Sequence, residues 1–167
     1  MLVLVLMAGV TGTGKSTLAN RLGRAQGWPV IDKDTAKSTL LAQAVAEDVA
    51  APLAYDLMFA EARDLLGQGY SVILDSPASS PMSVSNASII AQEVQARLKV
   101  VLCTADRTLR EARLRARTPM LSQPDRPDEL PMDEASRYEY LPSDTLTVDT
   151  SGSMDEVLTE VAAYVLN

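Results

Sequence analysis

The chain has 167 residues, of which 47% are hydrophobic and 22% charged, and its formal net charge is −7. That size and mixture are typical of one globular domain with a substantial core. The negative charge disfavours a surface for long nucleic acid, because such surfaces are basic. The sequence contains no histidine and one cysteine, which excludes histidine metal ligands, a histidine general base and an internal disulfide.

Apolar runs and helical patterns alternate from the first residues onward. The run 2–7 has the continuous apolar character of a parallel strand that is covered on both faces. It lacks the basic segment that precedes the apolar core of a signal peptide, and no run reaches the ~18 apolar residues of a membrane helix. We therefore expect a cytoplasmic protein. A helix is expected over 15–26 and a short second strand over 29–31.

The middle of the chain repeats this alternation. A long helical region is expected over 35–66, with an interruption near Pro52 because proline lacks the N–H of a helical residue. A third strand is expected over 71–74, a helix over 88–98 and a fourth strand over 99–103.

The last third begins with Asp106, which can cap a helix that runs to about Arg117. The segment 119–131 holds four of the nine prolines and predicts a loop, and a fifth strand (146–148) and a final helix (154–166) follow. Strands that alternate with helices predict a single three-layer α/β domain with a parallel sheet.

A phosphate-binding motif lies between the first strand and the first helix. The segment GVTGTGKS matches the pattern G-x-x-x-x-G-K-[ST]. Its glycines let backbone N–H groups turn toward phosphate oxygens, and the following helix directs its partial positive charge to the same place. We expect ATP, or GTP, to contact Gly9, Thr11, Gly12, Thr13, Gly14, Lys15, Ser16 and Thr17.

The acids after the second strand are candidates for the acceptor site, because ligands of open α/β sheets bind beyond the carboxyl ends of strands. Asp34 could accept a hydrogen bond from an acceptor hydroxyl, orient it and take its proton late in transfer. Alternatively, Asp34 only caps the next helix. Asp32 is expected to be structural or to act indirectly, through a residue that contacts the ligand. Lys37 could neutralise an acidic group or a transferred phosphoryl group, or it could be a solvated surface lysine.

Asp75 ends the third strand, where P-loop proteins place an acid that holds Mg²⁺. We therefore expect Ser16 and Asp75 to form a magnesium site, with Asp75 also bordering the substrate. The alternative is an ordinary acid at a turn. The following Ser76 and Pro77 are expected to shape the acceptor pocket.

Five arginines crowd the helix that follows Asp106, and a spacing of three and four residues places Arg110, Arg113 and Arg117 on one face. Guanidinium groups that close over ATP would stabilise the transition-state charge in the manner of an arginine finger. The alternative is a solvated helix, because Asp106 and Glu111 are close in sequence.

These segments together resemble the small P-loop kinases of the AAA_33 type, which group with polynucleotide-kinase-like, chloramphenicol-phosphotransferase-like and zeta-toxin-like enzymes. The resemblance runs through the segments 7–17, 32–37, 72–77, 109–117 and 146–151. It implies a single kinase domain over 1–167, a five-stranded parallel sheet with the order 2-3-1-4-5, and an arginine-bearing lid over roughly 107–137.

The resemblance also implies roles for individual residues. Asp34 takes the place of the acid that activates the acceptor, Arg113 lies against the adenine, and Arg117 contacts the phosphates, so that Lys15, Asp34 and Arg117 are the expected catalytic residues. Lys37 stands where polynucleotide kinases often carry an arginine, and lysine loses bidentate recognition of a phosphate.

The expected function is transfer of the γ-phosphoryl group of ATP, with Mg²⁺, to a hydroxyl of a small molecule: an antibiotic, a sugar, a nucleoside or a nucleotide sugar. One alternative is a polynucleotide 5′-hydroxyl kinase, which the net charge disfavours. Another class is a regulatory nucleotide-hydrolysing switch protein, although the sequence shows no second motif that would sense the γ-phosphate.

Overall fold

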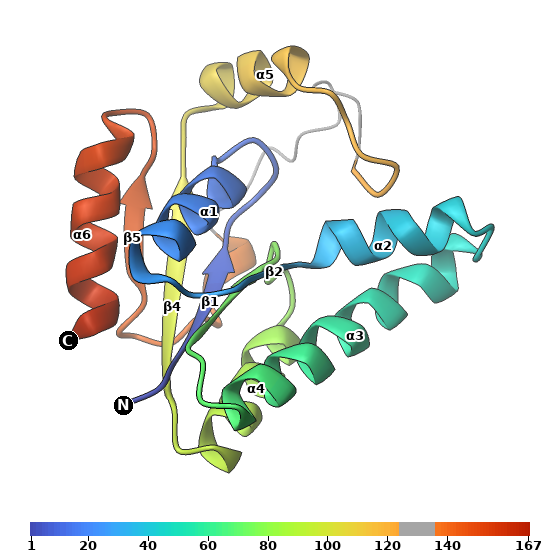
Figure 1. Ribbon diagram of the computed structural model, residues 1–167. Helices are drawn as coiled ribbons and strands as arrows, with labels where there is room; N and C mark the ends of the chain where they lie inside the picture. The colour runs from blue at the N-terminus through green and yellow to red at the C-terminus, as the bar shows by residue number, and fades with distance from the viewer. Residues whose placement is uncertain (124–135) are drawn as a thin grey trace.

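The computed structural model describes residues 1–123 and 136–167 (Figure 1). Within this part, five strands form one parallel sheet in the order β2-β3-β1-β4-β5, which confirms the order expected from the sequence. The strands are β1 (Val3–Ala8), β2 (Val30–Asp32), β3 (Val72–Asp75), β4 (Arg97–Thr104) and β5 (Leu146–Asp149).

Six α-helices and a short 3₁₀ turn connect these strands in the described part of the chain. They are α1 (Lys15–Gln26), α2 (Lys33–Ala42), α3 (Glu47–Gly67), α4 (Pro81–Glu93), α5 (Arg107–Ala116), η2 (Ser136–Tyr138) and α6 (Met154–Leu166). None of these helices is both long and apolar enough to cross a membrane. The expected lid falls partly on residues 124–135, which lie outside the described residues.

The domain has three layers because the sheet is covered on both faces (Figure 1). Successive side chains of a strand point to opposite faces. Val3, Val5 and Met7 therefore pack toward α1 and α6, and the alternate residues Leu4 and Leu6 pack toward α3 and α4. Every residue of β1 is buried, which explains its continuous apolar run.

Two helix boundaries differ from the sequence prediction. The helix expected over 88–98 is α4, which begins at Pro81, a residue suited to the first helical turn, and ends at Glu93. Gln95 then takes a positive φ of 56°, and β4 starts two residues later. The prediction was wrong because the serine-rich start of this helix lacks an apolar period.

The long helical region is interrupted at 43–46 and not near Pro52, which lies inside the second turn of α3. Ala44 adopts a left-handed φ of 60°, and the N–H of Val45 donates to the carbonyl of Leu40, as in a glycine-terminated helix. Because an alanine occupies the position where glycine is usual, no local sequence signal marks this helix end.

Candidate functional site

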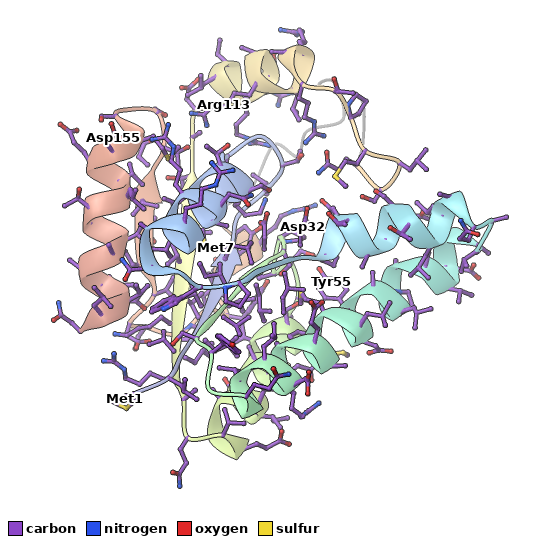
Figure 2. The ribbon with its side chains drawn as sticks, viewed as in Figure 1. Met1, Met7, Asp32, Tyr55, Arg113 and Asp155 are labelled. Atoms are coloured by element: carbon purple, nitrogen blue, oxygen red, sulfur yellow. The ribbon has the colours of Figure 1, made fainter. Side chains whose placement is uncertain are left out.

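A cavity of about 760 Å³ opens at the carboxyl end of the sheet. We divide its lining residues into two groups by their place in the chain. The loop half is defined as the phosphate loop with Arg113, Arg117 and Met154, and the α2 half as Lys33, Asp34, Ser79, Thr118, Met120, Ser122, Gln123, Arg137 and Tyr138. Residues 75–77 at the end of β3 also line the cavity and contact both halves. Figure 2 shows Arg113 at α5, and Asp32 at the start of α2 with Tyr55 on α3 below it in this view.

The phosphate loop has a backbone that requires glycine. Gly9, Gly12 and Gly14 have φ values of 130°, 82° and 81°. A Cβ on Gly9 would collide with the carbonyl oxygen of Cys103, and one on Gly12 would lie 3.0 Å from the Cβ of Arg110. Gly14 precedes α1 and provides no side-chain cap, so the N–H groups of the first turn stay available for an anion.

Most of the predicted loop residues line the cavity, and two do not. Thr11, Gly12, Gly14, Lys15, Ser16 and Thr17 line it. The buried Thr13 instead turns its hydroxyl inward and donates to the carbonyl of Val10 at 2.8 Å. Gly9 lies behind the loop, where its N–H donates to the carbonyl of Pro77 at 3.3 Å. The structure therefore gives these two residues a part in shaping the loop.

The end of β3 fits a magnesium ion. Asp75 is only 3% exposed, and its Oδ2 atom has no hydrogen-bond partner among the described residues. Burial raises the pKa of this carboxyl, although Lys15 and the Ser16 hydroxyl oppose the shift. A buried carboxylate oxygen without a partner is destabilising unless a cation binds it. Among residues 1–123 and 136–167, no group of three or more His, Cys, Asp or Glu side chains is placed to hold a metal ion by itself, so phosphates and water would complete an oxygen-ligand shell.

Asp32, and not Asp34, caps α2. Its Oδ1 accepts from the N–H of Asp34 at 2.8 Å and its Oδ2 from the hydroxyl of Thr35 at 3.1 Å. The structural role predicted for Asp32 is confirmed. The capping role considered for Asp34 is wrong, because the cap position is already occupied and the Asp34 carboxylate lines the cavity.

Two partners hold the Asp34 carboxylate. The Nζ atom of Lys33 lies 2.5 Å from Oδ1, and Nε2 of Gln123 donates to Oδ2 at 3.2 Å. Burial alone would raise the pKa of Asp34, but the hydrogen bond and charge of Lys33, with Gln123 and Lys15, leave it below the ordinary value of 3.8. Asp34 is therefore an ionised, oriented group at the carboxyl end of β2.

Lys33 was missed in the sequence, and Lys37 does not lie where it was expected. Lys33 is only 8% exposed and lies over the ring of Tyr55, 5.6 Å from its centroid. It follows β2 directly, so the rule that pointed to Asp34 could also have found it. Lys37 does not line the cavity; its Nζ pairs with Oε1 of Glu47 at 2.5 Å, joining α2 to α3.

The arginines of α5 divide into three groups. Arg113, and Arg117 directly after the helix, line the cavity, and their contact with nucleotide stays a prediction. Arg110 is buried, and its Nε donates to the carbonyl of Thr11 at 2.9 Å, so it supports the phosphate loop from behind. Arg107 and Arg115 pair with Glu111 at 2.9 and 3.5 Å on the helix surface, in agreement with the solvated alternative.

Arg113 has a structural connection to the far end of the sheet. Its Nη1 donates to the carbonyl of Gly12 at 3.3 Å and to Oγ1 of Thr150 at 3.0 Å, and its Nη2 donates to the carbonyl of Thr150 at 2.7 Å. The Thr150 hydroxyl in turn donates to the carbonyl of Thr13 at 2.6 Å. The end of β5 and α5 thus hold the loop together.

Two tyrosines and a serine make long-range contacts at or near the α2 half. The Tyr138 hydroxyl donates to the carbonyl of Pro77 at 3.0 Å, and the Tyr140 hydroxyl donates to the carbonyl of Ala78. Burial is the main reason that the pKa of Tyr138 rises to about 12, so this hydroxyl keeps its proton. Ser122 donates its hydroxyl to the carbonyl of Asp34 at 3.1 Å. The sequence prediction missed these contacts, which join residues more than 60 positions apart.

Known proteins resemble this chain in sequence pattern and in fold. The family model AAA_33, described as an AAA domain, matches residues 4–141. A proposed kinase from Chloroflexus aurantiacus superposes with a TM-score of 0.73 at 18% identity, over 99% of this chain and 96% of that one.

Two further solved structures have the same fold. The APS kinase of Mycobacterium tuberculosis in complex with AMPPNP and APS gives a TM-score of 0.68 at 19% identity, over 99% and 98% of the two chains. A gluconokinase from Sinorhizobium meliloti gives 0.63 at 18%, over 97% and 90%. No curated protein matches the chain.

Proposed function

Because this chain belongs to the AAA_33 family of AAA domains, whose model matches residues 4–141, we propose that it is an ATP-dependent kinase with a small-molecule hydroxyl acceptor. The observation that carries the proposal is that one cavity contains both a phosphate loop with Lys15 and, in its other half, the oriented carboxylate of Asp34. That arrangement provides for a phosphate donor and a hydroxyl acceptor at once.

The reaction needs no covalent enzyme intermediate, because positioning and electrostatics suffice for phosphoryl transfer. The acceptor oxygen bonds to the γ-phosphorus while the bond from that phosphorus to the β,γ-bridging oxygen breaks. ADP keeps the electron pair of the broken bond, and the hydroxyl proton leaves through Asp34 to water.

The residues of the loop half would stabilise the charge that moves in this step. Lys15 and Arg117 are the proposed charge-stabilising groups, and Arg113 would lie against the purine. Ser16 and Asp75 would hold Mg²⁺, which neutralises charge on the phosphate oxygens when bound. GTP is a second donor to test, since an arginine stacks on either purine.

Asp34 would orient the acceptor more than it would act as a strong base. The bonds from Lys33 and Gln123 stabilise its ionised form, and a carboxylate with a lowered pKa is a weak proton acceptor. A largely dissociative transfer needs little basicity before the phosphorus–oxygen bond breaks. Orientation of the hydroxyl is therefore its main proposed role.

The small-molecule acceptor is supported by the solved structures of similar fold, among which are an APS kinase and a gluconokinase. Long nucleic acid is disfavoured by the net charge of −7. We also place the protein in the cytoplasm, where ATP is available.

The test is a transfer assay with γ-labelled ATP and Mg²⁺ over antibiotics, sugars, nucleosides, nucleotide sugars and short 5′-hydroxyl oligonucleotides. Label on a small-molecule class is the expected result. Label on the oligonucleotides would favour a polynucleotide kinase. Label released only as inorganic phosphate, at a rate that no acceptor changes, would contradict the kinase and support a regulatory switch protein.

A further inference from the structure

The described residues that line the cavity have a net charge opposite in sign to that of the chain. The described residues that line it include five cations and two carboxylates, an excess of three positive charges, whereas the chain carries −7. Cations collected in a cleft raise the local concentration of anionic ligands. ATP with one Mg²⁺ carries about two negative charges at neutral pH. One positive charge is therefore in excess after the nucleotide is accounted for.

This excess lies in the α2 half. Lys15, Arg113 and Arg117 belong to the loop half, and Asp75 lies at the end of β3 beside Ser16. The α2 half contains the cations Lys33 and Arg137 and, among the described residues, only the Asp34 carboxylate to balance them. The nucleotide phosphates would be bound in the other half, so this charge is available to the acceptor.

Lys33 is held in place for such a contact. One of its three N–H donors faces Asp34, and the ring of Tyr55 lies under the ammonium group. Because the side chain is nearly buried, the ammonium group has little freedom to move into solvent.

Arg137 is the more exposed of the two cations. It forms no ion pair with any residue in the described ranges 1–123 and 136–167. Its neighbour Tyr138 is hydrogen-bonded to Pro77, which fixes the backbone of this segment beside the cavity. The guanidinium group is thus available to a ligand.

The rest of the α2 half is polar. Ser79, Thr118, Ser122 and Gln123 line it, against the apolar side chain of Met120. Ser122 and Gln123 already bond to Asp34, but an apolar ligand would leave the remaining hydrogen-bonding capacity of these groups unfilled. A ligand with several hydroxyls would fill that capacity.

We propose that the phosphoryl acceptor is a polyhydroxylated small molecule with one anionic group, whose charge is neutralised by Lys33 and Arg137 while its reacting hydroxyl lies at Asp34. This inference rests on the proposed kinase function. The anionic group is a carboxylate or a phosphate ester, two chemistries that the same cations recognise.

The test compares acceptors that share one carbon skeleton and differ in charge: glucose, gluconate and glucose 1-phosphate. Initial rates of label transfer from γ-labelled ATP give kcat/KM for each. One of the two anions is expected to exceed glucose by about tenfold to a hundredfold, the range for a hydrogen bond to a charged group. Gluconate or glucose 1-phosphate as the better acceptor identifies the anionic group. Equal values for the three compounds, or a higher value for glucose, would overturn the inference.

Variants separate charge recognition from folding. Arg137→Gln should lower the ratio of kcat/KM for the preferred anion to kcat/KM for glucose about tenfold. Arg63→Gln is the matched control, because Arg63 pairs with Glu93 on the surface and does not line the cavity. Lys33→Met should also lower the ratio of kcat/KM for the anion to that for glucose. Since Lys33 is buried, its variant counts only if its thermal unfolding resembles that of the wild type. Loss of activity toward glucose and the anion alike in Arg137→Gln would contradict the assignment.

Failure of the inference and failure of the proposed function give different results. Transfer to an apolar antibiotic in preference to any of the three compounds contradicts the inference and keeps the kinase. If no hydroxyl compound accepts label, the kinase proposal fails. The anion site can then still be tested by calorimetry, which measures the affinity of gluconate and glucose 1-phosphate for the protein with AMPPNP and Mg²⁺. Affinities no higher than that of glucose would overturn the inference.

Discussion

The two halves of the cavity are built in different ways. The loop half is mainly one continuous segment, 10–17, whose glycines and helix N-terminus make an anion site from backbone groups. The α2 half is made of side chains from distant parts of the sequence: Gln123 bonds Asp34 from 89 positions away, and Tyr138 bonds Pro77 from 61. An anion site made of backbone groups depends little on which side chains surround it. A site made of side chains is selective, because those side chains determine which ligand binds. The first half would therefore serve the common donor and the second the particular acceptor.

The largest expected effect lies in the loop half. Lys15→Ala should lower kcat by about 10³–10⁵-fold, the range known for removing a cation from a transferring phosphoryl group. The fold should persist, because Lys15 lines the cavity and forms no ion pair within the described residues. Steady-state transfer rates and circular dichroism measure the two properties, with Lys99→Ala as control, since Lys99 lies over Tyr164 and away from the cavity. Near-normal turnover in Lys15→Ala would refute the role of the loop.

The next effect lies in the α2 half. Asp34→Asn should reduce transfer by roughly 10²–10⁴-fold if the carboxylate receives the acceptor proton. Nucleotide affinity, measured by calorimetry with AMPPNP, should change little, because Asp34 lies outside the phosphate loop. If the transfer rate falls only a few fold, or if nucleotide affinity falls strongly, the assignment of nucleotide to the loop half and acceptor to the α2 half would be contradicted.

The lowered pKa of Asp34 predicts the pH dependence of transfer. Since the pKa lies below 3.8, the carboxylate stays ionised at neutral pH. Its stabilising interactions are present above the unfolded value and are lost only as the pH falls through the lowered value. The log of kcat/KM should thus show no limb from Asp34 between about pH 6 and 8, where a tuned base would titrate. A limb in that range that disappears in Asp34→Asn would contradict the orienting role.

Asp75 lies between the halves and should behave in the opposite sense. Burial is the chief cause of its raised pKa. Ionisation of Asp75 therefore destabilises the metal-free protein as the pH rises through the pKa of this carboxyl in the folded state. Asp75→Asn should therefore melt higher than the wild type at neutral pH in a chelator. It should also lose the stabilisation by AMPPNP with Mg²⁺, about 2.7 kcal/mol at a ligand concentration 100 times Kd. Calorimetric scans with and without Mg²⁺ measure both changes, and equal Mg²⁺ dependence in the two proteins would remove Asp75 from the metal site.

The smallest effect concerns the support of the α2 half. Tyr138→Phe removes the hydroxyl that donates to Pro77. It should destabilise the protein by about 1 kcal/mol, or about 2–4 °C in Tm for a chain of this size. Acceptor KM should rise while nucleotide KM stays constant. Tyr70→Phe is the matched control, because Tyr70 is exposed and far from the cavity lining. An equal shift in the two variants would mean that the Tyr138 hydroxyl contributes nothing specific.

What could be predicted from the sequence follows the same division. Five strands, their parallel order and the phosphate loop were predictable, because each depends on a local pattern or on a family resemblance. Helix α4 was placed too late because its serine-rich start hides its period, and the end of α2 was missed because Ala44 takes a left-handed backbone without being glycine.

In the site, residues that local sequence patterns mark were predictable, and contacts between residues distant in the sequence were not. The positions of Lys15, Ser16, Asp34 and Asp75 at the cavity were predictable because each lies at a glycine loop or near the carboxyl end of a strand. The pairing of Lys37 with Glu47, and the support of the loop by Arg110, depend on tertiary contacts that no local pattern encodes. The expected lid remains a prediction, since residues 124–135 lie outside the described part of the chain.

The central claim is that the loop half delivers a phosphoryl group to a hydroxyl bound in the α2 half. The most direct measurement follows the γ-phosphorus of ATP by ³¹P NMR, with Mg²⁺ and the best acceptor of the panel. The account predicts that the γ signal is replaced by that of a phosphate ester as ADP forms, with little inorganic phosphate, and that Asp34→Asn suppresses the ester. Formation of inorganic phosphate alone, at one rate with and without acceptor, would contradict it.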